Sequence, residues 1–313
     1  MGVAIGVDVG GTKIAGGVVD DAGSIVTRAR RDTPSTDPPA IVDNIVSIVQ
    51  ELRQNRAVDA VGIGSAGFVD AARSTVLFAP NLAWRDVPVR DLVMEATRLP
   101  VVVENDANAA AWGEFRFGAA EDVDDMVCVT VGTGIGGGLV LDGAVYRGAH
   151  GVGAELGHMR MVPGGHMCGC GNRGCLEQYA SGSALVREAQ ALASSRSVFA
   201  ARLLELAGGD PEEITGPMVT DAARDGDEPS RELLADLGRW LGEGLASFAA
   251  VLDPAVFVIG GGVSAAGDLL LGPAVGAFRR NLTGRGHRPE PEIRVATLGN
   301  DAGIVGAADL ARM

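Results

Sequence analysis

Residues 5–23 read IGVDVGGTKIAGGVVDDAG, and residues 127–143 read VCVTVGTGIGGGLVLDG. The second stretch repeats the form of the first, with Gly10 aligned to Gly132 at an offset of 122 residues. Each is an apolar run that turns at glycines and continues as a second apolar run before a tight turn, which predicts two β-hairpins. The repeat indicates two related halves, each offering one backbone loop. We expect the two loops to hold one polyphosphate from opposite sides.

Strands and helices alternate along the next part of the chain. Residues 41–52 have helical spacing, 58–67 and 100–106 read as buried strands, and 107–118 predict a helix that ends at Gly118. This alternation predicts an α/β layered fold, and a length of 313 residues favours two domains.

The second half of the chain reads mainly as helix. Residues 183–193 and 231–253 have apolar positions at three- and four-residue spacing. AVFVIGGGVS, at 255–264, predicts a strand, a triple-glycine turn and a helix start, and 292–312 predict a strand followed by an Ala-rich helix. The pattern extends the α/β prediction to the end of the sequence.

Composition and charge exclude several classes of protein. No segment approaches the roughly 18 uninterrupted apolar residues of a membrane helix, and the first residues lack the basic region and cleavage site of a signal peptide. We therefore expect a cytoplasmic protein without a membrane partner. The net charge is −14, from 40 acidic and 26 basic residues, which disfavours nucleic-acid binding because phosphate-backbone contacts need clustered cations.

The first glycine turn, DVGGTK at residues 8–13, predicts a phosphate-binding loop. Gly10 and Gly11 let backbone N–H groups approach phosphate oxygens, and Thr12 and Lys13 add a hydroxyl and a cation. Lys13 is the only lysine of the chain. Asp8 is placed to hold Mg²⁺, directly or through water. The loop is neither a Walker A motif nor a dinucleotide fingerprint, because a second strand follows it where those motifs continue into a helix. The alternative is a tight hairpin with a chance lysine.

Two further glycine clusters point to the same ligand. GTGIGGG at 132–138 predicts the second phosphate loop, with Gly132, Thr133 and Gly134 as contacts, and its pairing with the first loop favours this over an ordinary hairpin. Glycines 260–262 follow a buried strand and precede a helix start, where a nucleotide can lie. Gly260, Gly261 and Gly262 are equally compatible with a plain strand-to-helix turn.

Asp106 is the candidate catalytic base. It lies with Asn105 where a predicted strand ends and a helix begins, at the strand end that α/β folds use for ligands. Phosphoryl transfer to an alcohol needs a carboxylate that accepts the hydroxyl proton, with Mg²⁺ and amides neutralising the phosphate. We expect Asn105 to orient a sugar. The alternative role for Asp106 is a helix N-cap.

Residues 150–182 carry a candidate metal site. Cys168, Cys170 and Cys175 form a C-x-C-x4-C pattern, and three thiolates with one histidine complete a tetrahedral, structural Zn²⁺ site. His158 and His166 compete for the fourth position on spacing alone. The alternative is reduced cysteines in a surface loop. The fourth cysteine, Cys128, falls in a buried strand and is read as a core residue.

Together these motifs resemble one known family. DVGGTK, GIGSAGFVD, ENDANAAAWGE, GTGIGGG, HGVGAELGH, CGCGNRGCLEQYASG and GNDAGIVGAADLA are similar to the ROK (repressor, open reading frame, kinase) family, in particular to its actinobacterial glucose kinases. The resemblance spans nearly the whole chain. It implies a two-domain fold of the hexokinase, actin and Hsp70 type (ribonuclease H-like). We expect a small α/β domain at 1–107 with 298–313, a large one at 108–297, and ATP and sugar in the cleft between them.

The resemblance also implies roles for individual residues. In the family's pattern Asp106 is the catalytic base for ATP-dependent phosphorylation of glucose, and Asn105 binds sugar hydroxyls. The ExGH motif, which falls here on Glu155 and His158, makes His158 the fourth zinc ligand. The remaining sugar contacts implied are Gly67, Asn81, Glu155, His158 and Glu177.

Several alternative functions are compatible with these candidate residues. The acceptor sugar can be another hexose or an N-acetylhexosamine, the donor can be polyphosphate, and the protein can be a catalytically silent sugar sensor or an actin-like ATPase. The family's repressors carry an N-terminal winged helix, which we do not expect because the first hairpin begins almost at Met1. Ser65-Ala66-Gly67 departs from the family's GIGxPG loop by lacking its proline. Apolar helices beyond residue 230 are compatible with a homodimer or homotetramer.

Overall fold

The computed structural model describes residues 2–54 and 56–313. They form two compact units. The first unit contains the described residues of Met1–Cys128 with Gly137–Ala154 and Ala296–Met313, and the second contains Val129–Gly136 and Glu155–Val295. The division into 1–107 with 298–313 and 108–297, expected from the sequence, stays a prediction about domains.

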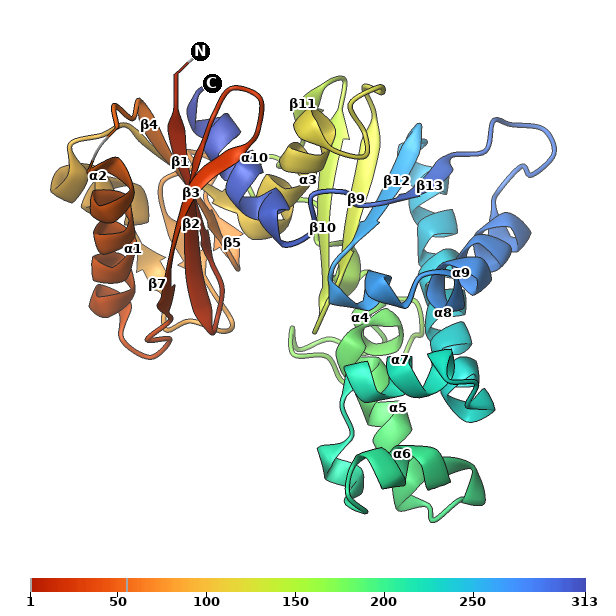
Figure 1. Cartoon of the computed structure of the whole chain (residues 1–313). Helices are drawn as coiled ribbons and strands as arrows, with labels where there is room; N and C mark the ends of the chain where they lie inside the picture. The colour runs from red at the N-terminus through yellow and green to blue at the C-terminus, as the bar shows by residue number, and fades with distance from the viewer. Residues whose placement is uncertain (1, 55) are drawn as a thin grey trace. The chain divides into compact units, whose positions relative to one another are not determined.

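The first unit is built on a five-stranded sheet (Figure 1). Its strand order is β3-β2-β1-β4-β8, with β1–β2 and β2–β3 antiparallel and β1–β4 and β4–β8 parallel. The carboxyl ends of β1, β4 and β8 therefore meet at one edge of the sheet. The strands are β1 (Ala4–Val9), β2 (Lys13–Val19), β3 (Ile25–Asp32), β4 (Ala60–Ser65) and β8 (Val101–Asn105).

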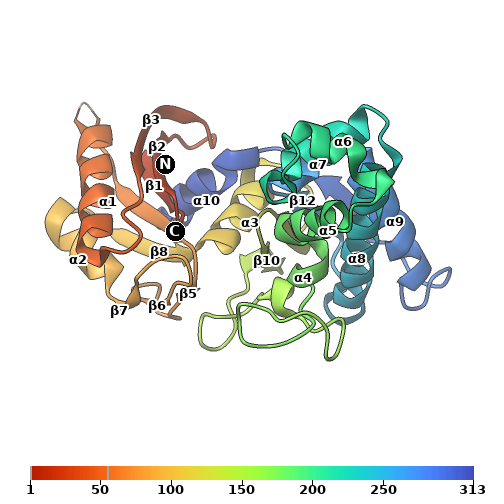
Figure 2. The same cartoon turned by 90° about the horizontal axis from the view of Figure 1, so that it is seen from below.

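Helices pack on this sheet, and Figure 2 shows α1 and α2 side by side. One core joins apolar residues of the sheet with the buried side chains of α1 and α2, and Trp84 lies fully buried within it. A small sheet of order β5-β6-β7 also belongs to this unit. These elements are α1 (Pro38–Arg53), α2 (Val89–Thr97), α3 (Asp106–Phe117), α10 (Ala302–Ala311), β5 (Phe68–Val69), β6 (Val76–Phe78) and β7 (Arg85–Val87).

Helix α10 packs unusually close to the sheet and to α3. A Cβ at Gly62 would lie 1.8 Å from the carbonyl oxygen of Ala307, and one at Gly306 would lie 1.8 Å from that of Ala109. Any side chain at these glycines would push the helix away. The last helix therefore anchors the first turns of α3, where the candidate base lies.

A second five-stranded sheet repeats the first. Its order is β11-β10-β9-β12-β13, so that the hairpin β9–β10 occupies the place of β1–β2 and β12 that of β4. The internal duplication predicted from the two glycine-rich stretches is thus present in the fold. The strands are β9 (Met126–Val131), β10 (Ile135–Leu141), β11 (Ala144–Val145), β12 (Val256–Gly260) and β13 (Glu292–Val295).

Outside β12 and β13, the regular structure of Glu155–Val295 in the second unit is helical. The long helix α8 packs against α9 and α7, and apolar residues of α5 to α8 form a separate core. The α-helices are α4 (Glu177–Ala180), α5 (Gly182–Ser194), α6 (Ala201–Leu206), α7 (Gly216–Arg224), α8 (Glu228–Leu252) and α9 (Asp268–Asn281). None of the helices in the described part of the chain combines the length and hydropathy needed to cross a bilayer.

Two local expectations change. A 3-10 helix, Gly262–Ala266, starts at the third residue of the triple glycine, and α9 begins only at Asp268. Within GTGIGGG only residues 132–134 lie in the turn, because β10 begins at Ile135. Gly138 is a packing residue in that strand, since a Cβ there would lie 2.4 Å from the Cβ of Ala111.

Candidate active site

In the first hairpin loop two carbonyl groups accept hydrogen bonds and two amides stay open. The N–H of Gly10 donates to Lys13 O at 3.0 Å, and Thr33 donates through N to Thr12 O and through Oγ1 to Gly10 O. Within the described residues, the N–H groups of Gly11 and Thr12 donate to no protein acceptor. Two open amides beside a partly buried lysine are the kind of donors that an anion-binding loop provides.

The second hairpin loop is fixed in the same way. Gly132 N donates to Gly134 O at 3.0 Å, and the first amides of α5 donate to the loop, Gly182 N to Gly132 O and Ser183 N to Thr133 O. Among the described residues, the N–H groups of Thr133 and Gly134 have no protein acceptor. Both loops thus present free backbone donors, although Lys13 has no counterpart in the second loop.

Asp8 and Asp106 lie near each other at the edge of the first sheet. Asp8 pairs in parallel register with Gly64 of β4, and a Cβ at Gly64 would lie 3.7 Å from Cα of Asp106. Burial, reinforced by the carboxylate of Asp106, raises the pKa of Asp8 to about 6, although Lys13 opposes the shift. Two carboxylates held this close favour a cation between or beside them.

Asp106 is the first residue of α3, and Asn105 is the N-cap. The side chain of Asn105 accepts from Asn108 N at 3.0 Å, because Asn105 keeps an extended backbone (φ −63°, ψ 143°). Asp106 Oδ1 accepts from Ala107 N at 2.9 Å. The N-cap role weighed for Asp106 is thus filled by its neighbour. Burial raises the pKa of Asp106, with hydrogen bonds from the Ala107 and Asp106 amides opposing the shift.

Gly67 and Asn81 lie beside these residues in the first unit. Gly67 O accepts from Asn105 Nδ2 at 3.0 Å, and the φ of Gly67 is 104°, a backbone conformation that favours glycine. A Cβ at Gly11 would lie 3.1 Å from the Cβ of Asn81. Gly67 therefore contacts the Asn105 amide, and Asn81 borders the phosphate loop.

In the second unit the three cysteines come together with His158. One ligand atom from each of these four residues lies within 4.8 Å of the others. Cys170 Sγ is 3.6 Å from Cys175 Sγ, and Cys168 Sγ is 3.6 Å from His158 Nδ1. The other competing histidine, His166, instead packs against Tyr179 with the rings tilted and their centroids 5.3 Å apart.

The cluster fits a tetrahedral zinc ion. Zn–S and Zn–N bonds of about 2.3 and 2.0 Å place sulfur atoms about 3.8 Å from each other and about 3.5 Å from the nitrogen, close to the separations found. Desolvation raises the pKa of the Cys168 thiol, and that of Cys175 to about 12. The buried thiols therefore need a cation nearby in order to ionise.

Glu155 and Glu177 flank the cluster in different ways. His158 Nε2 lies 3.9 Å from Glu155 Oε2, and Glu155 is exposed. Glu177 Oε2 accepts from Ile135 N at 3.1 Å, and its Oε1 accepts from Cys168 Sγ at 3.8 Å. Glu177 therefore links the second hairpin to the cysteine cluster, a contact that sequence reasoning missed because the partners are 42 residues apart.

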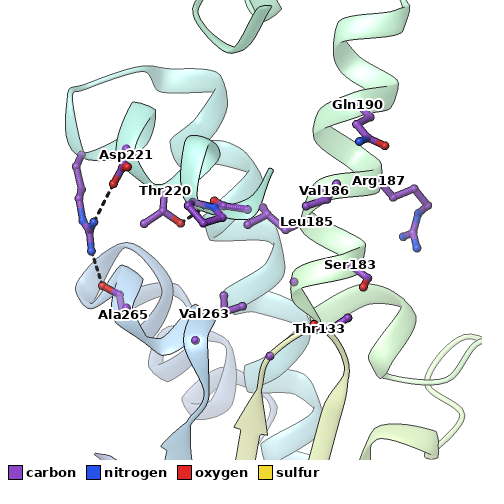
Figure 3. A pocket seen from close by; sticks show the side chains of 16 residues that line it. Thr133, Ser183, Leu185, Val186, Arg187, Gln190, Thr220, Asp221, Val263 and Ala265 are labelled. Atoms are coloured by element: carbon purple, nitrogen blue, oxygen red, sulfur yellow. Dashed lines mark hydrogen bonds and ion pairs between the residues drawn. The ribbon is translucent and has the colours of Figure 1, made fainter. Parts of the chain in front are cut away.

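A pocket of about 600 Å³ opens beside the second hairpin (Figure 3). Gly132, Thr133 and Gly262 line it, and Leu185, Val186, Pro217, Val263 and Ala265 give it apolar walls. On one side Arg224 donates to Asp221 Oδ1 and to Ala265 O. The walls from α5 and α7 were not predicted, because their helical periodicity indicates only a buried face.

The predicted site residues fall into two groups. Asp8, Gly10–Lys13, Gly67, Asn81, Asn105 and Asp106 belong to the first unit. Gly132–Gly134, Glu155, His158, the three cysteines, Glu177 and Gly261–Gly262 belong to the second. Gly260 is the last residue of β12.

Two sheets of one strand order, each opening with a glycine hairpin, define the two-domain hexokinase, actin and Hsp70-like class of α/β proteins, and the structural relatives below share it. The chain belongs to the ROK family, whose model matches residues 4–313.

Three relatives are similar to this chain over nearly its full length. The glucokinase of Streptomyces coelicolor is 51% identical over 312 residues, covering 100% of this chain and 98% of the relative. The crystal structure of a ROK family glucokinase from Streptomyces griseus, in complex with glucose and AMPPNP, is 52% identical with a TM-score of 0.90, covering 99% of both chains. That of the ROK hexokinase from Thermus thermophilus is 36% identical with a TM-score of 0.83, covering 99% of this chain and 98% of the other.

Proposed function

We propose that the protein transfers the γ-phosphoryl group of ATP to the 6-hydroxyl of glucose. One observation carries the proposal: a carboxylate at a helix start, Asp106, lies next to Asp8 and the phosphate-type hairpin of the same unit. Sequence similarity to glucokinases extends over the full length of the chain, and one of these relatives was crystallised with glucose and AMPPNP. This similarity supports the choice of substrates.

In this reaction Asp106 accepts the proton of the attacking hydroxyl. A raised pKa makes its carboxylate a stronger base than an exposed aspartate, provided that the enzyme works at a pH where the group is ionised. Its short side chain is held by the Ala107 amide, which fixes the direction of proton transfer. The remaining N–H of Asn105 Nδ2, whose other bond goes to Gly67 O, orients a sugar hydroxyl.

Each of the two hairpins offers backbone donors to the phosphates of ATP. The open amides of Gly11, Thr12, Thr133 and Gly134 donate to phosphate oxygens, and Lys13 adds a positive charge. Bound Mg²⁺, held at Asp8, would neutralise charge on the phosphates. The nucleoside occupies the pocket beside Gly132 and Gly262, whose apolar walls suit a planar base.

Further candidate sugar contacts are Asn81, which the first unit offers, and Glu155, His158 and Glu177, which the second unit offers. The Zn²⁺ that Cys168, Cys170, Cys175 and His158 would hold is structural: with Nδ1 directed to the metal, Nε2 of His158 carries its proton and donates to the sugar.

An ADP-release assay with Mg-ATP across hexoses and N-acetylhexosamines tests the proposal. Polyphosphate is offered in parallel as donor, with sugar phosphate as the product detected. We expect one strong signal, with glucose and ATP. Preference for another sugar or for polyphosphate would replace the substrate, and silence with retained sugar binding by calorimetry would identify a sensor. ATPase activity without sugar binding would identify an actin-like ATPase.

A further inference from the structure

Glu104 immediately precedes Asn105 and Asp106, and its side chain is only 3% exposed. Its Oε1 accepts from Asn105 N at 3.2 Å and from Asn108 Nδ2 at 3.1 Å. These two donors flank Asp106 in the sequence. One oxygen of a buried carboxylate thus holds both ends of the first turn of α3.

The other oxygen holds two arginines. Glu104 Oε2 accepts from Arg147 Nε at 2.6 Å and lies 3.4 Å from Arg73 Nε. Desolvation lowers the pKa of Arg73, an effect that Glu104 opposes and the like charge of Arg147 reinforces. The carboxylate is therefore the anion that lets two guanidinium groups share a largely buried space.

Both arginines belong to segments that border the site. Arg73 O accepts from Val103 N, so its loop completes the outer edge of β8. Arg147 follows β11, and its carbonyl oxygen accepts from Gly153 N, which closes the loop that leads in sequence to Glu155. The cluster of Glu104, Arg73 and Arg147 thus joins β8, the start of α3 and the 147–153 loop.

We propose that Glu104 is a positioning residue for Asp106 and Asn105, acting through this ionic cluster. Glu104 itself contacts neither substrate. When its charge is removed, the two arginines repel each other and the Asn105 and Asn108 contacts loosen, so the first turn of α3 shifts. The inference rests on the proposed function, because it assigns Asp106 the proton transfer.

Glu104→Gln is the main test. We expect kcat to fall on the order of 10- to 100-fold, because small misplacement of a reacting group is costly, while the glucose KM changes less because several contacts share the binding. Arg147→Gln should act in the same direction more weakly, since Arg73 remains, and Arg147→Lys should recover part of the loss. If Glu104→Gln folds poorly, Arg147→Gln replaces it as the test of the ionic cluster.

Asp309→Asn is the matched control. Asp309 is another largely buried carboxylate, and it accepts from Trp112 Nε1 at 2.8 Å and from Arg116 Nε at 3.3 Å, near the other end of the same helix. We expect this variant to lose thermal stability and to keep its kcat. Equal losses of kcat in Glu104→Gln and Asp309→Asn would reduce Glu104 to a stabilising residue and overturn the inference.

Amide hydrogen exchange of residues 105–109 separates this inference from the proposed function. Faster exchange in Glu104→Gln, with wild-type exchange in Asp309→Asn, supports positioning. Unchanged exchange overturns it, whatever the activity. A wild-type enzyme that phosphorylates no sugar would contradict the proposed function alone, since the exchange comparison still decides whether Glu104 holds the helix start.

Discussion

The two glycine hairpins share one backbone plan but not one chemistry. Both tie their loop carbonyl groups to a neighbouring segment and leave two amides open. The first hairpin adds Asp8 and Lys13, whereas Thr130 and Ile135 occupy the matching positions of the second. Both hairpins therefore keep the backbone donors that suit a phosphate, whereas only the first hairpin carries the charged side chains, Asp8 and Lys13, that we propose for Mg²⁺ and phosphate.

The largest effect should come from Asp106, which follows the last residue of β8 and begins α3. Asp106→Asn keeps the shape of the side chain but removes the base, so we expect kcat to fall by about 10³-fold or more with glucose binding nearly unchanged. ADP release and calorimetry measure the two quantities. Asp91→Asn, in the first turn of α2, is the control and should keep its turnover. A kcat within tenfold of wild type would exclude Asp106 as the base.

The next effect tests the asymmetry of the hairpins directly. Lys13→Ala removes the charged donor of the first loop, and we expect kcat/KM for ATP to fall on the order of 10²- to 10³-fold. Thr133→Ala, at an exposed residue of the second loop, should change it less than tenfold, because that loop binds through its backbone. Initial rates at varied ATP concentration give both values. Equal losses would show that the second loop also relies on its side chains.

A third prediction concerns how the buried carboxylate of Asp8 lowers the free energy of unfolding. The folded-state pKa of Asp8, about 6, lies above the ordinary value of 3.8, so the native state binds more protons between these pH values. The free energy of unfolding therefore falls as pH rises through this window, by up to about 3 kcal/mol. Asp8→Asn should be more stable than wild type by about 1–3 kcal/mol at pH 8, with no gain at pH 3.5.

Urea unfolding at both pH values, without added Mg²⁺, measures this difference. Asp301→Asn provides a control of opposite sign. The hydrogen bond from Arg28 lowers the pKa of Asp301, so ionised Asp301 stabilises the fold above its unfolded pKa and loses that contribution as pH falls. A stability gain for Asp8→Asn that does not depend on pH would contradict the pKa argument.

Sequence reasoning reached the fold because its decisive signals are local. The two hairpins, α1, α3 and α8 follow from apolar periodicity and from glycines placed where turns occur, and the predicted fold class and ROK membership are confirmed. Strand β3 was not predicted, because IVTRARRD is an edge strand with charged, largely exposed side chains and no apolar alternation. The short strands β5 to β7 have too few residues to show a period.

The candidate site was predictable only where its residues are neighbours in sequence. The cysteine spacing indicated a metal cluster, but the choice between His158 and His166 needed the family resemblance, and the structure now places only His158 beside the cysteines. The Glu177–Ile135 hydrogen bond and the Glu104–Arg147 ion pair join residues about 40 positions apart. Contacts of that separation depend on tertiary packing and have no sequence period to reveal them.

The smallest effect on catalysis should come from removing zinc. The zinc cluster lies in the second unit, so this prediction compares a binding role there with the proton transfer proposed for Asp106 in the first unit. His158→Ala should lower the zinc content and raise the glucose KM on the order of tenfold, because it removes both a metal ligand and the proposed Nε2 donor. The kcat should change less than threefold, since Asp106 is retained. His166→Ala removes a histidine of the same segment that lies outside the cluster, so its zinc content and glucose KM should match wild type.

Metal analysis measures the zinc content of each variant, and glucose saturation curves give its KM and kcat. Chelation of the wild-type protein provides a zinc-free sample with the native sequence. Zinc-free protein should also unfold at a lower temperature, because the cluster's buried thiols lose the cation that closes residues 158–175 into one structure. Normal glucose KM in zinc-free protein would mean that the metal stabilises the segment without orienting His158. A collapse of kcat at unchanged KM would instead place part of the chemistry in the second copy and break the contrast between the two halves.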